Sequence, residues 1–171
     1  MKRIAFGLVV VSLVLGLGRV AAARADTSVD TFPVQFVLSS ATCAELPSGT
    51  TITGSGTFKS VTNQRTDQNG VTTVINSSHA RGTATDQDGN VYTFSYSNEF
   101  HVSDTAGDPG LFSGLMTDQF LLEGKGPLKL NNGFVIELTT DLLSLFEVED
   151  VIQFHGDPLD FAAFTTHCDP L

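Results

Sequence analysis

The sequence has no tryptophan, only two cysteines and few positive charges: nine Lys and Arg residues stand against 19 Asp and Glu residues. The lysines and arginines are scattered, and the net charge of −10 repels phosphate backbones and anionic membranes. Nucleic acid is therefore not expected as a partner. Phosphate-binding loops and nucleophile elbows are also missing at their required spacing, so no motif indicates a cofactor or a metal site.

The N-terminus has the features of an export signal. Lys2 and Arg3 form a basic segment, residues 4–17 form an apolar segment, and Ala25 ends an A-x-A cleavage site. We therefore expect residues 1–25 to be a signal peptide and residues 26–171 a single secreted domain with no membrane span after processing. The alternative is an uncleaved membrane anchor.

The two cysteines lie near opposite ends of the expected mature chain, at Cys43 and Cys168. In an exported protein an even pair of cysteines is usually oxidised, so a Cys43–Cys168 disulfide is predicted. Its expected role is to stabilise the fold by crosslinking two distant parts of the chain. The alternative is a reactive thiol, which the sequence does not favour because no cationic residue lies beside either cysteine. Removal of the signal leaves five basic residues and a net charge of about −14, which suits an extracellular or cell-surface location.

Residues 51–102 predict a β-meander. Two turns of the same design, Asp67-Gln68-Asn69-Gly70 and Asp86-Gln87-Asp88-Gly89, separate three extended runs rich in Thr, Val and aromatic residues. In each turn an Asn-Gly or Asp-Gly pair is expected to supply the positive φ angles of a tight hairpin. The last run alternates most regularly, with Tyr and Phe on one face and polar residues on the other, which predicts a half-buried strand.

The remaining segments extend this pattern. Strands are predicted at residues 32–38, 111–122, 128–130, 134–138 and 147–155, with a third hairpin at Asn131-Asn132-Gly133. Asp157 before Pro158 predicts the start of a short C-terminal helix. Together, these segments predict an all-β antiparallel meander of seven to eight strands. Such a meander would close into an up-and-down barrel or fold into a β-sandwich. We favour the barrel.

A barrel of this composition could hold an apolar ligand. The chain contains 13 phenylalanines, and the inward aromatic residues of the meander face a run of glycine and alanine that could leave a cavity. The residues predicted to bind a small apolar ligand are Tyr92, Phe94, Tyr96, Phe100, Phe112 and Met116.

The alternative function is a small β-barrel enzyme, such as an isomerase, cyclase or hydrolase. Its acid and base groups would come from the densest group of titratable residues, in which a carboxylate could lie near a histidine on one strand face. These residues are Glu147, Glu149, Asp150, His155 and Asp157. A solvated acidic face accounts for the same residues, so a secreted, non-enzymatic domain is the preferred interpretation, and no catalytic residue is assigned.

One stretch carries a resemblance. The pattern Gly82-Thr83-Ala84-Thr85-Asp86-x-Asp88-Gly89-Asn90-x-Tyr92-x-Phe94-x-Tyr96, followed by Asp118-x-Phe120-x-Leu122-x-Gly124-x-Gly126, resembles small secreted all-β proteins of high-GC bacteria. It covers about the middle third of the chain. The resemblance implies an exported bacterial β-domain and carries no catalytic residue.

Overall fold

The computed structural model describes residues 24–105, 108–142, 146–156, 159–160, 165–166 and 168–171. The expected signal peptide therefore lies outside the described residues, apart from Arg24 and Ala25, which belong to the first strand. Among the described residues, no helix is long and apolar enough to cross a membrane.

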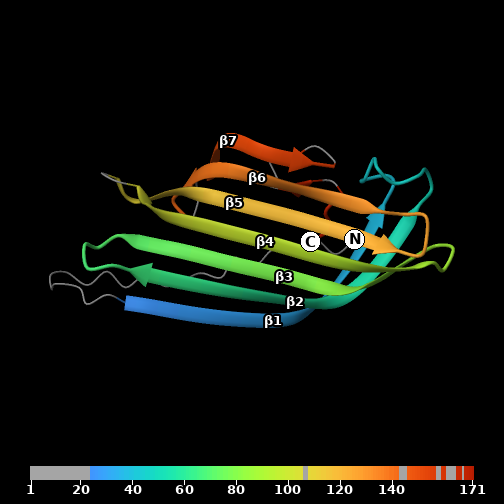
Figure 1. Cartoon of the computed structure of the whole chain (residues 1–171), viewed down its shortest axis with the longest axis horizontal. Coiled ribbons are helices and arrows are strands. Elements are labelled where there is room, and N and C mark those ends of the chain that lie inside the picture. Colours follow the sequence, from blue (N-terminus) through green and yellow to red (C-terminus); the bar gives the residue numbers. More distant parts are fainter. Residues whose placement is uncertain (1–23, 106–107, 143–145, 157–158, 161–164, 167) are drawn as a thin grey trace.

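Seven long strands form one antiparallel sheet in which each strand pairs with the next along the chain (Figure 1). The predicted meander is therefore confirmed. The strands are β1 (Arg24–Ser39), β2 (Thr51–Thr66), β3 (Thr72–Asp86), β4 (Val91–Thr105), β5 (Asp108–Gly124), β6 (Leu130–Thr140) and β7 (Phe146–His155).

The two predicted hairpin turns are present and share one hydrogen-bond pattern. Asp67 Oδ1 accepts bonds from the amides of Asn69 and Val71, at 2.8 and 2.9 Å. Asp86 Oδ1 does the same for the amides of Asp88 and Asn90. Only the glycine of each turn has a positive φ, so the expectation that both central residues adopt positive φ is wrong. The aspartate side chain stabilises the turn in their place.

The third predicted hairpin, at Asn131-Asn132-Gly133, is wrong. These residues lie inside β6, which pairs with β5 without a break through Asn131, Asn132 and Gly133. Asn132 is fully buried and donates a long hydrogen bond to Glu45 of the β1–β2 loop. A Cβ at Gly133 would overlap the carbonyl of Asp118, so glycine is needed here for close strand contact rather than for a turn.

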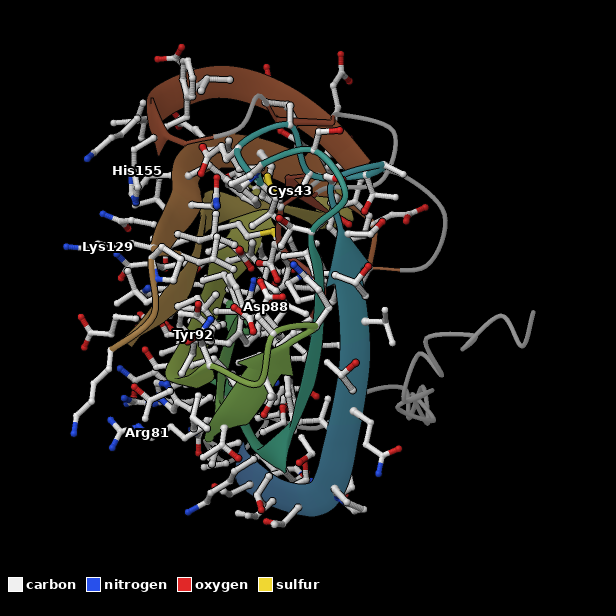
Figure 2. The ribbon with its side chains drawn as sticks, turned by 90° about the vertical axis from the view of Figure 1, so that its right-hand side faces the viewer. Cys43, Arg81, Asp88, Tyr92, Lys129 and His155 are labelled. Carbon is white, nitrogen blue, oxygen red and sulfur yellow. A yellow bond between two sulfur atoms is a disulfide. The ribbon has the colours of Figure 1, made fainter. Side chains whose placement is uncertain are left out.

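The sheet curls strongly but does not close. β1 and β7 are its two edges and do not pair with each other, so the predicted barrel is not confirmed, and the seven strands lie in one sheet rather than two. Viewed along the strands, the curled sheet surrounds an interior filled with side chains, with β1 and β6 on opposite sides (Figure 2). The seven described strands thus form a trough that is open between β1 and β7.

The predicted disulfide is confirmed. Cys43 and Cys168 are bonded with their Cα atoms 4.5 Å apart, and 125 positions separate them in the sequence. Both are fully buried, which disfavours the reactive-thiol alternative. The bond ties the C-terminal residues to the β1–β2 loop, which lies over the interior beside the disulfide in Figure 2.

The predicted C-terminal helix is not found among the described residues. Leu159–Asp160 (β8) and Thr165–Thr166 (β9) form a short antiparallel pair instead. Asp157 and Pro158, the expected helix start, lie outside the described residues.

Removal of the disulfide should lower stability strongly. We expect the double variant Cys43→Ala, Cys168→Ala to lose roughly 4 kcal/mol of unfolding free energy, because the bond closes a very long loop in the unfolded chain. Urea unfolding followed by fluorescence or circular dichroism measures the change. Reduced wild-type protein should show a similar loss of unfolding free energy. An unchanged urea midpoint in both the double variant and the reduced protein would contradict a stabilising role for the disulfide.

Candidate functional site

A line of polar side chains crosses the concave face of the sheet. The strand register places Ser60 of β2 beside Ser78 of β3, Ser78 beside Asn98 of β4, and Asn98 beside Asp118 of β5. All four lie in phase with apolar neighbours that face the interior. We call Ser60, Ser78, Asn98 and Asp118 the polar line.

The polar line divides the interior into two apolar clusters. The first gathers around the β1–β2 loop and the disulfide and contains Phe36, Phe94, Phe120 and Leu122. The second lies towards the opposite ends of the strands and contains Val102, Phe112, Phe134 and Ile136. Each cluster excludes water on its own side, so the polar groups between them must bond to one another or to a ligand.

At the β2–β3 end the polar line is well bonded. Asn76 donates to the hydroxyls of Ser60 and Thr62, at 2.8 and 2.7 Å. The Ser78 hydroxyl lies within hydrogen-bond distance of Ser60 Oγ, at 3.0 Å, and of Asn76 Oδ1, at 2.9 Å, and donates its single proton to one of them at a time. These bonds form a local network that uses the amide and hydroxyl groups of both strands.

At the β5 end the polar line is incompletely bonded. Asp118 is 7% exposed, and its Oδ2 accepts hydrogen bonds from the Tyr96 hydroxyl, at 2.8 Å, and from Asn98 Nδ2, at 3.0 Å. Its Oδ1 is buried and has no hydrogen-bond partner among the described residues. Leaving a buried carboxylate oxygen without a hydrogen-bond donor is costly.

A second carboxyl group interacts with the side chain of Asp118. Asp169, next to Cys168, is half-buried beside Asp118, and its pKa is raised to about 9 by burial and then by the Asp118 carboxylate. Its Oδ1 accepts a bond from the Leu171 amide. Burial and Asp118 also raise the pKa of Tyr96. Near neutral pH this raised pKa favours the protonated form of Asp169. We call Asp118 and Asp169 the acid pair.

A row of aromatic rings leads away from the acid pair. Tyr96, bonded to Asp118, stacks with Phe58 at a centroid distance of 6.0 Å, and Phe58 stacks with Phe32 at 4.9 Å. Ala80 lies between Phe58 and Tyr96 in the register, and its small side chain lets the two rings meet above β3. Exposure rises along the aromatic row: Tyr96 and Phe58 are half-buried and Phe32 is 48% exposed.

The six residues predicted to bind a ligand do not form one group. Tyr92 and Phe94 are buried in the first apolar cluster, and Tyr96 packs against it. Phe112 is buried in the second cluster, against which Phe100 and Met116 pack. The polar line thus separates the six residues into two sets of three. Tyr92 donates from its hydroxyl to Asp86 of the hairpin turn, which gives it a role in that turn.

The expected space above the glycine and alanine face is filled by the protein itself. A Cβ at Gly54 would overlap the Phe36 ring, and one at Gly82 would come within 2.6 Å of the Phe94 ring. Phe36 and Phe94 meet edge to face with centroids 5.0 Å apart. The small residues therefore make room for aromatic packing across the sheet.

The acidic and histidine residues proposed for an enzyme are not gathered. Glu147, Glu149 and Asp150 are exposed on β7, and Glu149 accepts a bond from Thr139. Glu149 and His155 are six positions apart on the same strand, a distance of roughly 20 Å. Asp157 lies outside the described residues.

His155 lies instead against Gly133, beside a small hollow of about 160 Å³. Its Nε2 is buried and has no hydrogen-bond partner among the described residues. Asp118 also borders this hollow, but its carboxylate is bonded to Tyr96 and Asn98. Among the residues that the structure describes, His155 therefore has no carboxylate partner of the kind that an acid–base mechanism needs.

A larger, open hollow of about 910 Å³ lies along β1, β2 and β3 where they bend. It is bordered by Phe36, Gly54, Thr42 and, from the C-terminal residues, Asp169 and Pro170. Neither hollow is lined by any of the six predicted ligand residues. Asp169 borders this hollow, whereas Asp118 does not.

The sequence contains part of the signal for this site. Asp118 interrupts an otherwise apolar strand face, and Asn98 stands in phase between Tyr96 and Phe100. A polar residue at an inward position is the mark of a buried network or a site. Asp169 has no such signal, because its position depends on the disulfide and not on a strand pattern.

The comparisons with known proteins identify no relative: no family model, curated protein or solved structure matches the chain. Nor do the described residues contain any group of three or more His, Cys, Asp or Glu side chains placed to hold a metal ion.

The acid pair should make stability depend on pH. The pKa of Asp169 is about 9 in the folded chain against an ordinary value of 3.8, so its contribution is greatest below about pH 4 and falls as pH rises towards 9. We expect Asp169→Asn, whose amide can donate to Asp118 at any pH, to melt at a higher temperature than wild type at pH 8 and to lose this part of the pH dependence.

The measurement is thermal unfolding from pH 4 to pH 9. The matched control is Glu123→Gln, which removes one charge at an exposed position and should keep the wild-type slope. Parallel curves for Asp169→Asn and wild type would show that the pKa of Asp169 is not raised in the folded chain.

Proposed function

We propose that this chain is an exported, non-enzymatic domain that binds a small, largely apolar ligand along the concave side of its open sheet. The observation that carries the proposal is the aromatic row Phe32–Phe58–Tyr96. Its rings stack on one another, yet the row becomes more exposed towards Phe32 instead of being covered by the core. Exposed aromatic faces beside polar groups are typical of ligand sites.

The open trough takes the place of the closed barrel cavity expected from the sequence. Of the six ligand residues predicted, Tyr96 is in the row, and Phe100 and Met116 are half-buried beyond the polar line. These three supply the accessible part of the proposed site. Tyr92, Phe94 and Phe112 are buried and support it from the two apolar clusters.

The disulfide is consistent with export to an oxidising compartment, because such bonds persist there and are rare in the cytosol. The strongly acidic composition supports a soluble, extracellular or cell-surface location. The enzyme alternative has no comparable support, since its acid and base groups are spread along β7.

Binding of a neutral apolar dye tests the proposal. We expect Nile red to become fluorescent on the protein, and Phe32→Ala to weaken its affinity roughly fivefold through the loss of about 1 kcal/mol of aromatic contact. Phe154→Ala is the matched control, because Phe154 is 58% exposed on β7 and is not in the aromatic row. Equal effects of the two variants, or no dye binding, would argue against this site.

A further inference from the structure

The small hollow beside His155 lies on the outer, convex face of the sheet, away from the aromatic row. Successive residues of a strand point to opposite faces, so Thr117 and Gln119 of β5 face away from the side on which Asp118 joins the polar line. Figure 2 shows His155 on the outer side of β6, away from the disulfide in the interior. Asp118 therefore borders the hollow with its main chain, and its carboxylate belongs to the concave side.

The hollow lies where Gly133 leaves out a side chain. The register places Gly133 of β6 between Gln119 of β5 and His155 of β7. A Cβ at Gly133 would overlap the Asp118 carbonyl and would lie 3.2 Å from His155 Nε2, so the imidazole lies over the glycine. Glycine inside a strand marks a place where another backbone or a ligand comes close. The outward-facing side chains that line the hollow are those of Ser97, Thr117, Gln119, Val135, Gln153 and His155.

These side chains have unused hydrogen-bonding groups. His155 Nε2 is buried and has no partner within the described part of the chain. The side chains of Ser97, Thr117 and Gln153 likewise make no hydrogen bond to the residues that the structure describes. A buried ring nitrogen without a partner is costly, so a group that enters the hollow and bonds to it would be stabilised.

A single bridging water does not account for this space. One water needs roughly 10–15 Å³, and the hollow measures about 160 Å³. Pockets that enclose a whole drug-sized molecule measure roughly 300–1,000 Å³. The hollow therefore suits one edge of a larger molecule, the rest of which stays outside.

The lining specifies a neutral ligand with several hydroxyl groups. Hydroxyl, carboxamide and imidazole groups can each donate and accept hydrogen bonds, as alcohol groups of a ligand also do. No charged side chain faces the hollow from its lining, and Glu99, which is exposed and paired with Thr117 in the register, disfavours an anion. Gln119 donates one long bond, of 3.3 Å, to Asn131 and keeps its amide oxygen for a ligand.

Two other ligand classes suit the hollow less well. A peptide cannot add a strand here, because β5 and β6 are already paired on both edges. The described residues also place no three His, Cys, Asp or Glu side chains together for a metal ion.

We propose that this hollow binds a neutral sugar, one edge of which is hydrogen-bonded by Thr117, Gln153 and His155. Val135 supplies an apolar contact for the C–H groups of the ring. The site is separate from the apolar site on the concave side and does not depend on it. Phe134 is only 1% exposed, so no accessible aromatic ring adds to binding, and we expect affinities of about 1 mM.

The experiment is a titration of the mature, isotopically labelled chain, followed by NMR of the backbone amides and the histidine rings. The probes are the methyl glycosides of glucose, galactose, mannose and N-acetylglucosamine, at concentrations well above the expected dissociation constant. We expect at least one glycoside to cause saturable shifts centred on residues 117, 119, 133, 153 and 155. Glucuronate, which adds a negative charge, should bind at least fivefold more weakly than that glycoside.

Two variants and one control locate the site. Thr117→Val keeps the shape of the side chain, suits a strand and removes one hydroxyl, so it should weaken binding about fivefold. His155→Phe should abolish binding, and Thr117→Val serves if His155→Phe disturbs the fold. His101→Phe is the matched control, because His101 is exposed on the same face of β4 and does not line the hollow. It should leave affinity unchanged.

Absence of saturable shifts with all four glycosides would overturn this proposal. Tighter binding of glucuronate would show that the ligand class is wrong, and equal losses in Thr117→Val and His101→Phe would show that the sugar binds elsewhere. Each of these results would leave the apolar site standing, since Nile red and Phe32→Ala report on the concave side alone.

Discussion

The register of β2 to β5 is the constraint on which the rest of this structure depends. Because side chains alternate between the two faces of a strand, a shift of one residue would move every inward residue to the outer face. The observed register aligns Ser60, Ser78, Asn98 and Asp118 across four strands. The same alignment places Gly54 and Gly82 under the Phe36 and Phe94 rings.

The disulfide helps to cover the interior that the open sheet leaves exposed. A meander that leaves β1 and β7 unpaired with each other keeps one side of its interior open, which costs stability unless other residues cover it. The β1–β2 loop supplies Cys43 and Leu46 to the first apolar cluster, together with Cys168. The bond between the cysteines holds the C-terminal residues against this cluster and brings Asp169 next to Asp118. A structural crosslink therefore also positions a chemical group.

The interior changes from apolar to polar and acidic across the sheet. Its aromatic clusters are closely packed, its polar line is hydrogen-bonded at the β2–β3 end, and its β5 end holds the two carboxyl groups of the acid pair. The aromatic row connects this end to the open trough. Such an arrangement, with an apolar path that ends at a few polar groups, is what binding of a small amphipathic molecule requires.

The sequence by itself determined the antiparallel meander, two of the hairpins and the disulfide partners. It missed residues 24–31 of β1, and of the separate strand predicted at residues 128–130 only Leu130 is in a strand, at the start of β6. Alternation of apolar and polar residues, Asx-Gly turns and the pairing of two cysteines are local or countable features, so they can be read without coordinates. Only the tertiary structure decided that the sheet stays open, that Asn131-Asn132-Gly133 continues a strand, and that Asp169 meets Asp118. Each depends on contacts between distant segments: the Asn132–Glu45 bond, the fit of Gly133 against Asp118, and the crosslink at Cys168. A single sequence shows that Asp118 lies on an apolar face, but it does not show which group stands opposite.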